Sequence, residues 1–503
     1  MHIVMASSEA IPFAKTGGLA DVAGTLPVEL CKLGHDCSVF LPAYQTAKQY
    51  ANQRPEVQFD ESVASLVVDL AGHPVHAWIH RVKLPNCPVN FYLVDQPMFY
   101  DRHGLYGDSH GTFGDNCARY CFFSRAVVEA IERLGIPIDI IHCHDWQTGL
   151  IPAYHRTQTN QHSWYRRSAS VMTIHNMAYQ GRFWGPDMVL TGLDHGLFHW
   201  EWMEHYGDLN LLKTGIAFAD ALTTVSPTYA REIQSHPQGC GLEGLLSSRS
   251  DRLFGIVNGI DESVWNPQTD PNLAAHFNKN TWREGKAACK RSLQESLGLP
   301  IRADVPLIGI VGRLADQKGW DLIVQLMRWW IEHRDVQWAI LGSGEQRYAD
   351  MLFQLAMQRP DRVSLQTTFS DPLAHRIEAA ADIFLMPSLY EPCGLNQLYS
   401  LRYGAIPVVR STGGLADTVC DATAEHIEQG IATGFAFDDY TPEALANATI
   451  RALEIYSHSP GIWSKIVETG MNQDWSWTKS ATAMLDVYER ARQFARIDQR
   501  LRP

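Results

Sequence analysis

The first 42 residues, MHIVMASSEAIPFAKTGGLADVAGTLPVELCKLGHDCSVFLP (1–42), decide the fold. HIVMAS (2–7) is a short apolar run that predicts a buried strand. DVAGTLPVELCKLG (21–34) has apolar residues at helical spacing and ends in a glycine, and DCSVFLP (36–42) is a second apolar run. A strand, a helix and a strand within about 40 residues form a β-α-β unit, which indicates a parallel sheet.

The same alternation of apolar runs and helical segments continues along the chain. In the first half, further strands are predicted at 89–94, 139–144, 170–175, 221–226 and 253–259. A second series begins after Ala303, with strands predicted at 305–314, 336–344, 362–369, 381–388 and 405–411 and a helix over 319–333. The sequence therefore predicts an α/β protein with two Rossmann-like, doubly wound halves, whose ligands bind beyond the carboxyl ends of the strands.

A polar segment separates the two halves. DESVWNPQTDPNLAAHFNKN (261–280) contains two prolines and has no clear periodicity. We therefore predict an N-terminal domain over 1–260 and a C-terminal domain over 261–476. The last stretch, 477–503, has helical spacing and is expected to pack back towards the N-terminal domain. A chain of 503 residues allows two to four domains of roughly 150 residues each.

Composition narrows the function classes. Hydrophobic residues make up 45% of the chain and charged residues 19%, which is typical of a globular protein. The formal net charge is −13, whereas proteins that bind the nucleic-acid backbone present a basic face, so we expect no nucleic-acid partner. A local basic pocket for a phosphorylated small molecule is compatible with this charge.

Neither export nor membrane insertion is predicted. The N-terminus has no basic region followed by a long apolar core, so we expect no signal peptide. No stretch approaches 18 uninterrupted apolar residues, so no membrane span is expected. The ten cysteines are scattered without a framework and are typical of reduced thiols, which predicts a cytoplasmic protein.

One hexapeptide, TGGLAD, occurs at Thr16–Asp21 and again at Thr412–Asp417, too far apart for a tandem repeat. Each copy follows a predicted strand and opens a predicted helix. Paired glycines let the backbone approach a ligand closely, and a helix N-terminus offers unpaired N–H groups and a positive dipole end. The copies therefore predict two helix starts that bind an anion or a sugar; the alternative is that the glycines merely permit tight turns.

At this point the sequence resembles a known family. The segment AKTGGLADVAGTLP (14–27) is similar to the N-terminal signature of bacterial glycogen synthases and plant starch synthases. The resemblance continues in order and spacing over most of the chain, through HDWQTGL (144–150), TIHNMAYQG (173–181), TVSPTYAREI (224–233), VNGID (257–261), GRLADQKGWDL (312–322), SLYEPCGLNQLYSLRYG (388–404) and STGGLADTV (411–419). It implies the GT-B fold of the GT5 family, with two Rossmann-like domains facing a central cleft.

The resemblance also implies an activity. Members of this family are retaining glucosyltransferases, so we expect transfer of glucose from ADP-glucose to the non-reducing 4-hydroxyl end of an α-1,4-glucan such as glycogen, starch or malto-oligosaccharide. No cofactor is expected. Alternatives are a related transferase that uses UDP-glucose or another acceptor, and a catalytically silent glucan-binding protein. A nicotinamide oxidoreductase is disfavoured because no G-x-G-x-x-G follows the first strand. A cytoplasmic enzyme, free or on glucan granules, is the simplest expectation.

The first glycine pair carries several predicted ligand contacts. Lys15 precedes it, and a lysine beside a helix N-terminus adds a point charge to an already positive site. The resemblance implies that Lys15 contacts the nucleotide diphosphate and that Gly17 and Gly18 lie near the donor sugar or its phosphate. Asp21 would then bind the nucleotide sugar or the acceptor. The alternative for Lys15 is a solvated loop lysine.

Two histidine motifs end predicted strands. A histidine at the carboxyl end of a strand can hydrogen-bond a substrate, and the resemblance assigns His175 to the donor glucose near its 6-hydroxyl, followed by Asn176. The alternative is a satisfied core histidine. In HCHD (142–145) the two histidines share one side of a strand, but without further ligands zinc is not expected. The resemblance instead places Asp145 and Trp146 against the acceptor glucan.

Two cations follow the strand LIGIV of the second half. Arg313 and Lys318 can neutralise a departing diphosphate, whose charge develops mainly in the transition state. No D-x-D pair occurs in the chain, which fits a site without a metal ion. The alternative is a surface ion-pair cluster of these cations with Asp316 and Asp321.

One carboxylate is predicted at the donor sugar. Glu391 lies in YEPCGLNQ, in a loop bent by a proline and a glycine. A carboxylate there can orient sugar hydroxyls and stabilise positive charge on an oxocarbenium-like centre. The resemblance places Glu391 at the donor glucose and adds the backbone N–H groups of Cys393, Gly394 and Leu395. It also implies an adenine stacked on Phe369, a diphosphate at the second glycine pair, and further contacts; these substrate-binding residues are Asn258, Phe369, Tyr390, Thr412, Gly413 and Gly414.

Overall fold

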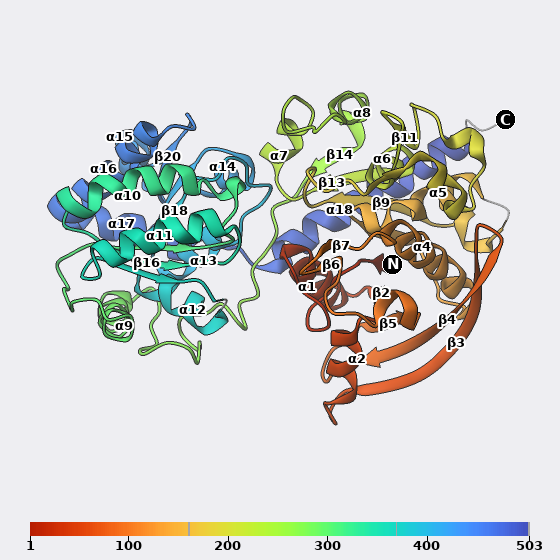
Figure 1. Cartoon of the computed structure of the whole chain (residues 1–503), viewed down its shortest axis with the longest axis horizontal. Coiled ribbons are helices and arrows are strands. Elements are labelled where there is room, and N and C mark those ends of the chain that lie inside the picture. Colours follow the sequence, from red (N-terminus) through yellow and green to blue (C-terminus); the bar gives the residue numbers. More distant parts are fainter. Residues whose placement is uncertain (159–160, 369, 501–503) are drawn as a thin grey trace. The chain divides into compact units, whose positions relative to one another are not determined.

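The computed structural model describes residues 1–158, 161–368 and 370–500, with side chains through residue 498. The chain divides into two compact units, each with its own parallel sheet (Figure 1). Unit 1 comprises Met1–Val225, Ala230–Ile256 and Trp477–Pro503, and unit 2 comprises Ser226–Tyr229 and Val257–Ser476. The expected domain ranges of 1–260, 261–476 and 477–503 stay a prediction beside this division.

Unit 1 is built on a nine-stranded sheet. Its order is β14 (Leu253–Gly255), β13 (Ala221–Thr224), β9 (Ala169–Ile174), β8 (Ile140–His144), β1 (His2–Ala6), β2 (Asp36–Pro42), β5 (Asn90–Asp95), β4 (His73–Lys83) and β3 (Gln58–Leu70). The strands from β14 to β5 pair in parallel, and β4 and β3 are antiparallel. The strands β8 and β9 are buried along their whole length, as expected for a parallel sheet covered on both faces.

The strand order reverses between β1 and β8. From β1 the chain builds β2 and β5 on one side, and it returns later to add β8, β9 and β13 on the other. Ligands of open α/β sheets bind beyond the carboxyl ends of the strands at such a switch point. The segments that leave β1, β8 and β9 at this edge carry Lys15, Asp145 and His175, respectively.

The hairpin β3–β4 was not expected from the sequence. Its strands lie at the sheet edge, and their residues alternate between exposed and buried positions with charged residues on the open face. Such strands lack the continuous apolar run that marked the buried strands. Two smaller sheets complete unit 1: β10 (Arg182–Trp184) with β12 (Asp208–Asn210) and β11 (Glu204–His205), and β6 (Gly107–Asp108) with β7 (Gly111–Thr112).

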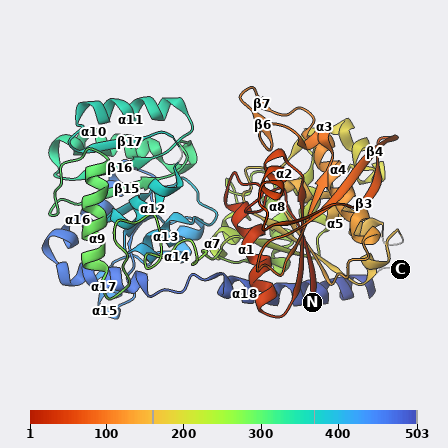
Figure 2. The same ribbon diagram turned by 90° about the horizontal axis from the view of Figure 1, so that it is seen from below.

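Helices cover the sheet of unit 1. They are α1 (Gly18–Lys32), α2 (Gln45–Asn52), α3 (Pro97–Tyr100), α4 (Asn116–Arg133), α5 (Leu150–Thr157), α6 (Leu211–Phe218), α8 (Glu243–Ser248) and α18 (Trp477–Arg500). The C-terminal helix α18 lies beside α1 and packs on β9 and β13 (Figure 2). Near its end, Asp498 accepts hydrogen bonds from Arg156 (2.8 Å) and Arg252 (2.9 Å). The short helix α7 (Pro227–Glu232) begins in the segment that belongs to unit 2.

Unit 2 contains a six-stranded parallel sheet. Its order is β17 (Val363–Gln366), β16 (Gln337–Leu341), β15 (Leu307–Val311), β18 (Ile383–Met386), β19 (Ile406–Arg410) and β20 (Phe435–Phe437). The switch point lies between β15 and β18, whose following loops carry Arg313 and Glu391. The helices are α9 (Trp282–Ser296), α10 (Trp320–His333), α11 (Gln346–Gln358), α12 (Asp371–Ala380), α13 (Asn396–Tyr403), α14 (Gly413–Thr418), α15 (Ala424–Gln429), α16 (Pro442–His458) and α17 (Pro460–Met471).

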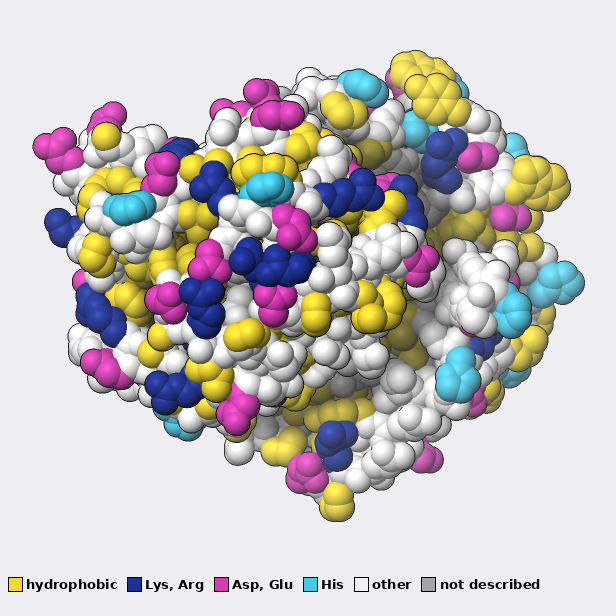
Figure 3. All heavy atoms as spheres, turned by 60° about the vertical axis from the view of Figure 1, so that its left-hand side comes forward, with side chains coloured by type: hydrophobic (Ala, Val, Ile, Leu, Met, Phe, Trp, Pro, Cys, Tyr) yellow, Lys and Arg dark blue, Asp and Glu magenta, His cyan; other side chains and the backbone are white. Residues whose placement is uncertain are grey.

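Acidic and basic side chains are interspersed on the face drawn in Figure 3, without a continuous field of either sign. Within the described ranges, none of the helices is both long enough and apolar enough to cross a membrane.

Candidate active site

The first TGGLAD copy opens α1, with Gly17 as its N-cap residue. A neighbouring carboxylate already lies at this helix start: Glu9 accepts hydrogen bonds from the backbone N–H of Thr16 (2.5 Å), its hydroxyl (2.6 Å) and the N–H of Gly17 (3.3 Å). The hydroxyl of Tyr106 donates to the same carboxylate at 2.6 Å. Negative charge at the positive end of a helix is stabilising. The protein thus supplies its own anion to three hydrogen-bond donors of the motif, which belong to Thr16 and Gly17.

Lys15 is paired as well. Its ammonium donates to a carboxylate oxygen of Asp21 at 2.7 Å, with the lysine side chain 53% exposed and the aspartate 20%. The structure gives this lysine a carboxylate partner and leaves its side chain in contact with solvent, and its expected role at the diphosphate stays a prediction. Because the ion pair is exposed on its lysine side, a ligand can reach the ammonium without opening the fold.

The second TGGLAD copy opens α14 in a different environment. A Cβ added at Gly414 would lie 2.0 Å from the carbonyl oxygen of Cys393, and one at Gly413, which has φ +47°, would lie 2.0 Å from that of Glu391. The N–H of Gly414 donates to the Glu391 carbonyl at 3.0 Å. Here the glycines let the helix start pack against the loop that carries Glu391. At Gly17, by contrast, an added Cβ would meet no atom of the described residues within 4 Å.

Three histidines lie in a row: His142 in the middle of β8, His144 at its carboxyl end, and His175 just after β9. The ring centroids of His142 and His144 are 4.2 Å apart, which confirms that they share one side of the strand, and those of His144 and His175 are 5.3 Å apart. His144 Nδ1 lies 3.0 Å from His175 Nε2. Burial lowers the pKa of His175 to about 3, so this ring is neutral at physiological pH.

Asp145 holds the turn that presents His175. Its backbone has φ 56°, a strained conformation for a residue with a side chain, and its carboxylate accepts the backbone N–H of His175 at 2.7 Å. Burial raises the pKa of Asp145 to about 7, although the N–H groups of His175 and Asn176 oppose that rise. The side-chain oxygen of Asn176 accepts the N–H of Ala178 at 3.0 Å. In unit 1, Asp145 therefore acts on the backbone of the His175 loop.

Trp146 forms part of an aromatic cluster in the 3₁₀ turn Trp146–Thr148. Its ring packs edge-on against Tyr120, at 4.8 Å between centroids, and against Phe183, at 5.6 Å. A Cβ at Gly181 would lie 2.4 Å from the Trp146 ring, so the glycine permits this packing. The ring is half-buried, which leaves apolar surface of the kind that sugar rings contact.

In unit 2 the predicted catalytic cation and carboxylate meet. Lys318 donates to Glu391 Oε2 at 2.6 Å, and the hydroxyl of Ser388 donates to the same oxygen at 3.0 Å. The Glu391 side chain is 7% exposed and that of Lys318 is 24% exposed. Gly319 follows with φ +73°, and a Cβ there would lie 2.1 Å from the carbonyl oxygen of Pro387. The close approach of these two loops fixes the ion pair at the switch point.

Arg313 is exposed and bonds to the side chain of Gln317 at 3.2 Å, without an ion pair to any described carboxylate. The alternative of a cluster with Asp316 and Asp321 is wrong. Asp316 instead pairs with Arg347 and accepts the Tyr348 hydroxyl, and Asp321 accepts the Tyr440 hydroxyl at 2.6 Å. Arg313 is thus available to an anionic ligand.

The remaining predicted residues of unit 2 lie in or beside the loop that carries Glu391. The carbonyl oxygen of Tyr390 accepts from Gln317 at 3.3 Å. Cys393 is buried, which raises the pKa of its thiol to about 12 despite a hydrogen bond from the backbone N–H of Asn258. Gly394 has φ +71°, Leu395 is the N-cap residue of α13, and Thr412 is the buried N-cap residue of α14. Phe369 lies outside the described residues.

Sequence reasoning missed two partners of the TGGLAD motifs. Glu9 is an isolated acidic residue just after the first buried strand, and its position there was the available signal. The other is Thr228, whose N–H and hydroxyl both donate to Asp417 of the second copy at 2.7 Å. Each motif is thus tied to a second segment of its own unit.

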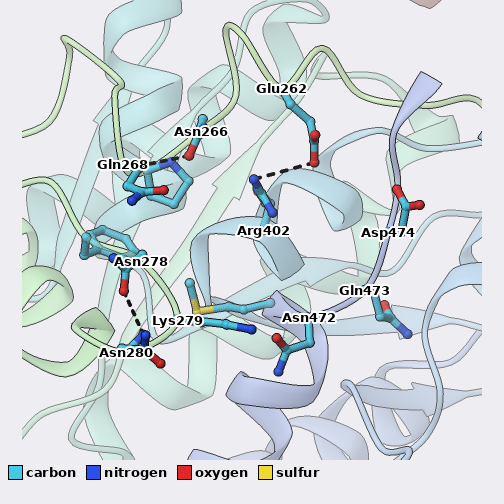
Figure 4. A pocket seen from close by; sticks show the side chains of 13 residues that line it. Glu262, Asn266, Gln268, Asn278, Lys279, Asn280, Arg402, Asn472, Gln473 and Asp474 are labelled. Carbon is cyan, nitrogen blue, oxygen red and sulfur yellow. Dashed lines mark hydrogen bonds and ion pairs between the residues drawn. The ribbon is translucent and has the colours of Figure 1, made fainter. Parts of the chain in front are cut away.

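A cavity of about 520 Å³ lies elsewhere in unit 2 (Figure 4). Amide side chains line it, together with Lys279 and an ion pair between Glu262 and Arg402 at 3.5 Å. None of the predicted site residues lines this cavity. Over the described part of the chain, no group of three or more His, Cys, Asp or Glu side chains is arranged to hold a metal ion.

Comparisons with known proteins cover most of the chain. The profile of the starch synthase catalytic domain matches residues 2–248, and that of glycosyl transferases group 1 matches residues 295–461. The chain is 46% identical to a glycogen synthase of Rhodopirellula baltica, covering 97% of this chain and 98% of that one. It is 44% identical to a glycogen synthase of Syntrophotalea carbinolica, covering 98% and 99% of the two chains.

A solved structure of a similar protein has the same fold. The catalytic domain of starch synthase IV from Arabidopsis thaliana, bound to ADP and acarbose, superposes with a TM-score of 0.88 at 33% identity, covering 98% of this chain and 99% of that one. The expected fold class, two parallel α/β domains of the GT-B type, is confirmed.

Proposed function

This chain belongs to the glycogen synthase family and transfers glucose to an α-1,4-glucan, and we propose that its donor is ADP-glucose and that the new bond forms at the non-reducing 4-hydroxyl with retention of configuration. It is then an ADP-glucose:α-1,4-glucan 4-α-glucosyltransferase. The starch synthase relative bound to ADP supports an adenine nucleotide in the donor. A cytoplasmic location, with or without attachment to glucan granules, stays a prediction.

The observation that carries the proposal is the Lys318–Glu391 ion pair beside the exposed Arg313. Two cations beyond the carboxyl end of β15, opposite the Glu391 loop that follows β18, offer charge to a diphosphate as it departs. In the free protein the Lys318 ammonium is balanced by Glu391. A bound diphosphate gives that ammonium a second anionic partner, which leaves Glu391 freer to accept hydrogen bonds from sugar hydroxyls and to stabilise positive charge at the anomeric carbon.

We propose that the reaction proceeds on one face of the sugar. The bond from the anomeric carbon to the phosphate oxygen breaks while the 4-hydroxyl oxygen of the acceptor attacks from the same side. The acceptor proton passes to the leaving phosphate oxygen, so ADP departs with that proton and no protein nucleophile is needed. His175 would bind the donor glucose, and Lys15 with Gly17 and Gly18 would contact the nucleotide sugar.

The first experiment measures ADP and UDP release from the matching nucleotide-glucose, with and without glycogen, in the presence of a chelator. Glycogen-dependent ADP release that survives the chelator is expected. Release of UDP alone would move the donor to UDP-glucose. No release from either donor, despite retained glucan binding, would refute transfer and leave a glucan-binding protein.

Substitution separates the predicted roles. Glu391→Ala and His175→Ala are each expected to lower kcat by about 100-fold or more, on the scale of lost transition-state contacts, while the far-UV circular dichroism spectrum is unchanged. Glu391→Gln is the matched control for shape, because it can still accept the Ser388 hydroxyl but carries no charge. Near-normal turnover of a folded Ala variant would remove that residue from the mechanism.

A further inference from the structure

His144 lies behind His175 and is fully buried. The two rings meet through His144 Nδ1 and His175 Nε2 at 3.0 Å, so one of these nitrogens carries a proton and the other accepts it. Burial, followed by the neighbouring His142 and His175, holds the pKa of His144 well below its ordinary value. Each ring is therefore neutral and carries one proton, and two arrangements of those protons are open.

The other nitrogen of His144 distinguishes between them. In the part of the chain that the structure describes, His144 Nε2 is buried without a hydrogen-bond partner. The adjacent His142 cannot supply one, because its Nδ1 lies 2.8 Å from the Tyr488 hydroxyl and its Nε2 lies 2.6 Å from Thr173 Oγ1. A buried N–H without an acceptor is rarer in proteins than a buried acceptor without a donor. The proton of His144 therefore belongs on Nδ1, which leaves a bare lone pair at Nε2.

We propose that His144 is a positioning residue, which donates from Nδ1 to His175 Nε2 and thereby fixes His175 in the tautomer that is protonated at Nδ1. His175 Nδ1 forms no hydrogen bond among the described residues and is not one of the buried unpartnered atoms, so it is the ring nitrogen that a ligand can reach. His175 then meets its ligand as a hydrogen-bond donor. The identity of the ligand as the donor sugar rests on the proposed function, whereas the assignment of the tautomer does not.

This assignment constrains the chemistry of the site. The single lone pair of a neutral His175 points at His144 and is occupied, so His175 cannot accept a proton from the acceptor hydroxyl. The proton must leave by another route, which agrees with transfer to the leaving phosphate. His175 contributes a fixed N–H dipole, and a fixed dipole needs no reorganisation when charge shifts during the reaction.

Nitrogen NMR tests the tautomer directly in the unmodified enzyme. Protein labelled with ¹⁵N-histidine gives two-bond and three-bond correlations that distinguish the Nδ1–H form from the Nε2–H form, and the signals absent from His175→Gln identify His175. We expect His175 and His144 both to be protonated at Nδ1. A His175 signal of the Nε2–H form, or of a doubly protonated ring, overturns the proposal. This readout does not depend on turnover, so it stands even if ADP-glucose is not the donor.

Kinetics of two variants test the consequence. The side-chain amide of His144→Asn places an N–H donor near the position of Nδ1, whereas His144→Leu fills similar volume without a donor. Since partners that orient a functional histidine are worth on the order of 10–100-fold, His144→Leu should lower kcat at least about tenfold with little change in KM, and His144→Asn should keep kcat within about threefold.

The matched control is Tyr488→Phe, which removes the hydroxyl bound to His142 at the far end of the same row and leaves the His144–His175 contact intact. It should keep both kcat and the His175 tautomer. An equal loss of kcat in the Asn and Leu variants, or full activity of folded His144→Leu, contradicts the proposal. If His144→Leu does not fold, the NMR result on the unmodified enzyme decides.

Discussion

The buried carboxylate of Asp145 makes the stability of unit 1 depend on pH in a direction opposite to that of most aspartates. Burial raises its pKa from 3.8 to about 7, against the hydrogen bonds that it accepts from the N–H groups of His175 and Asn176. A raised pKa means that the folded chain binds the proton more tightly than the unfolded chain. The associated stability is fully present below pH 3.8 and is lost as the pH rises through 7.

The magnitude follows from this shift. One pKa unit corresponds to about 1.4 kcal/mol, so the charged carboxylate costs the fold roughly 4 kcal/mol at pH 8 but less than about 2 kcal/mol at pH 5. Asp145→Asn has no charge at either pH, and its side-chain oxygen can still accept the N–H of His175. The variant should therefore gain roughly 2–3 kcal/mol more over the parent protein at pH 8 than at pH 5.

Urea unfolding of both proteins at pH 5 and pH 8 measures this double difference, in which the other titrating groups cancel. The control is Asp251→Asn, the same substitution at a side chain that is 71% exposed, which reports the effect of the amide on urea unfolding at each pH without burial. An Asp145→Asn advantage that is equal at the two pH values, or a variant less stable than the parent at pH 8, would refute the burial argument.

Two further predictions concern the glycine motifs and the C-terminal helix. Gly414→Ala should destabilise unit 2 and slow turnover, because the added Cβ would lie 2.0 Å from the carbonyl oxygen of Cys393. Gly17→Ala should keep the melting temperature of the parent protein, because Gly17 has φ −156° and open space beside it. Equal melting temperatures of the two variants would contradict this contrast. Asp498→Asn should cost about 2 kcal/mol at pH 7, since hydrogen bonds from Arg252 and Arg156 outweigh burial and hold the pKa of Asp498 at about 2. That stability is present above pH 3.8 and is lost as the pH falls through 2, so a deficit in urea unfolding that is undiminished at pH 2 would contradict the assignment.

The sequence was most informative where local pattern and burial coincide. The predicted strands at 2–7 and 36–42 became β1 and β2 within one residue, because a parallel strand buried on both faces needs a continuous apolar run. Helix α1 begins at Gly18 and not at residue 21, since the glycine pair itself enters the first turn although its helix propensity is low. The strand β20, three residues long, and the exposed hairpin β3–β4 have too little apolar pattern to be predicted.

Site residues could be named from the sequence, but their partners could not. The spacing of HCHD indicated that two histidines share a face, yet only the fold brings His175 to His144, thirty-one positions away. Glu9 likewise acquires its role because the chain after β1 turns back to place its carboxylate at the start of α1. Contacts between segments distant in sequence depend on the packing of the whole sheet, and no local pattern encodes them.

The two TGGLAD copies show why an identical motif need not make an identical site. In the first copy the space beside Gly17 is open and the helix start holds the Glu9 carboxylate; in the second, backbone carbonyls fill the space beside the glycines. The predicted cations likewise differ in their surroundings. Lys15 and Lys318 each have a carboxylate partner, so a diphosphate that bound to either lysine would exchange one anionic contact for another, and the net gain would be the difference between two ion pairs. Arg313 has no such partner among the described carboxylates, so its attraction for a bound diphosphate would not be offset by a lost ion pair. Under the proposed function, we therefore expect recognition of a diphosphate in unit 2 to rest chiefly on Arg313, and its contact with Lys318 to loosen the hold of that lysine on Glu391.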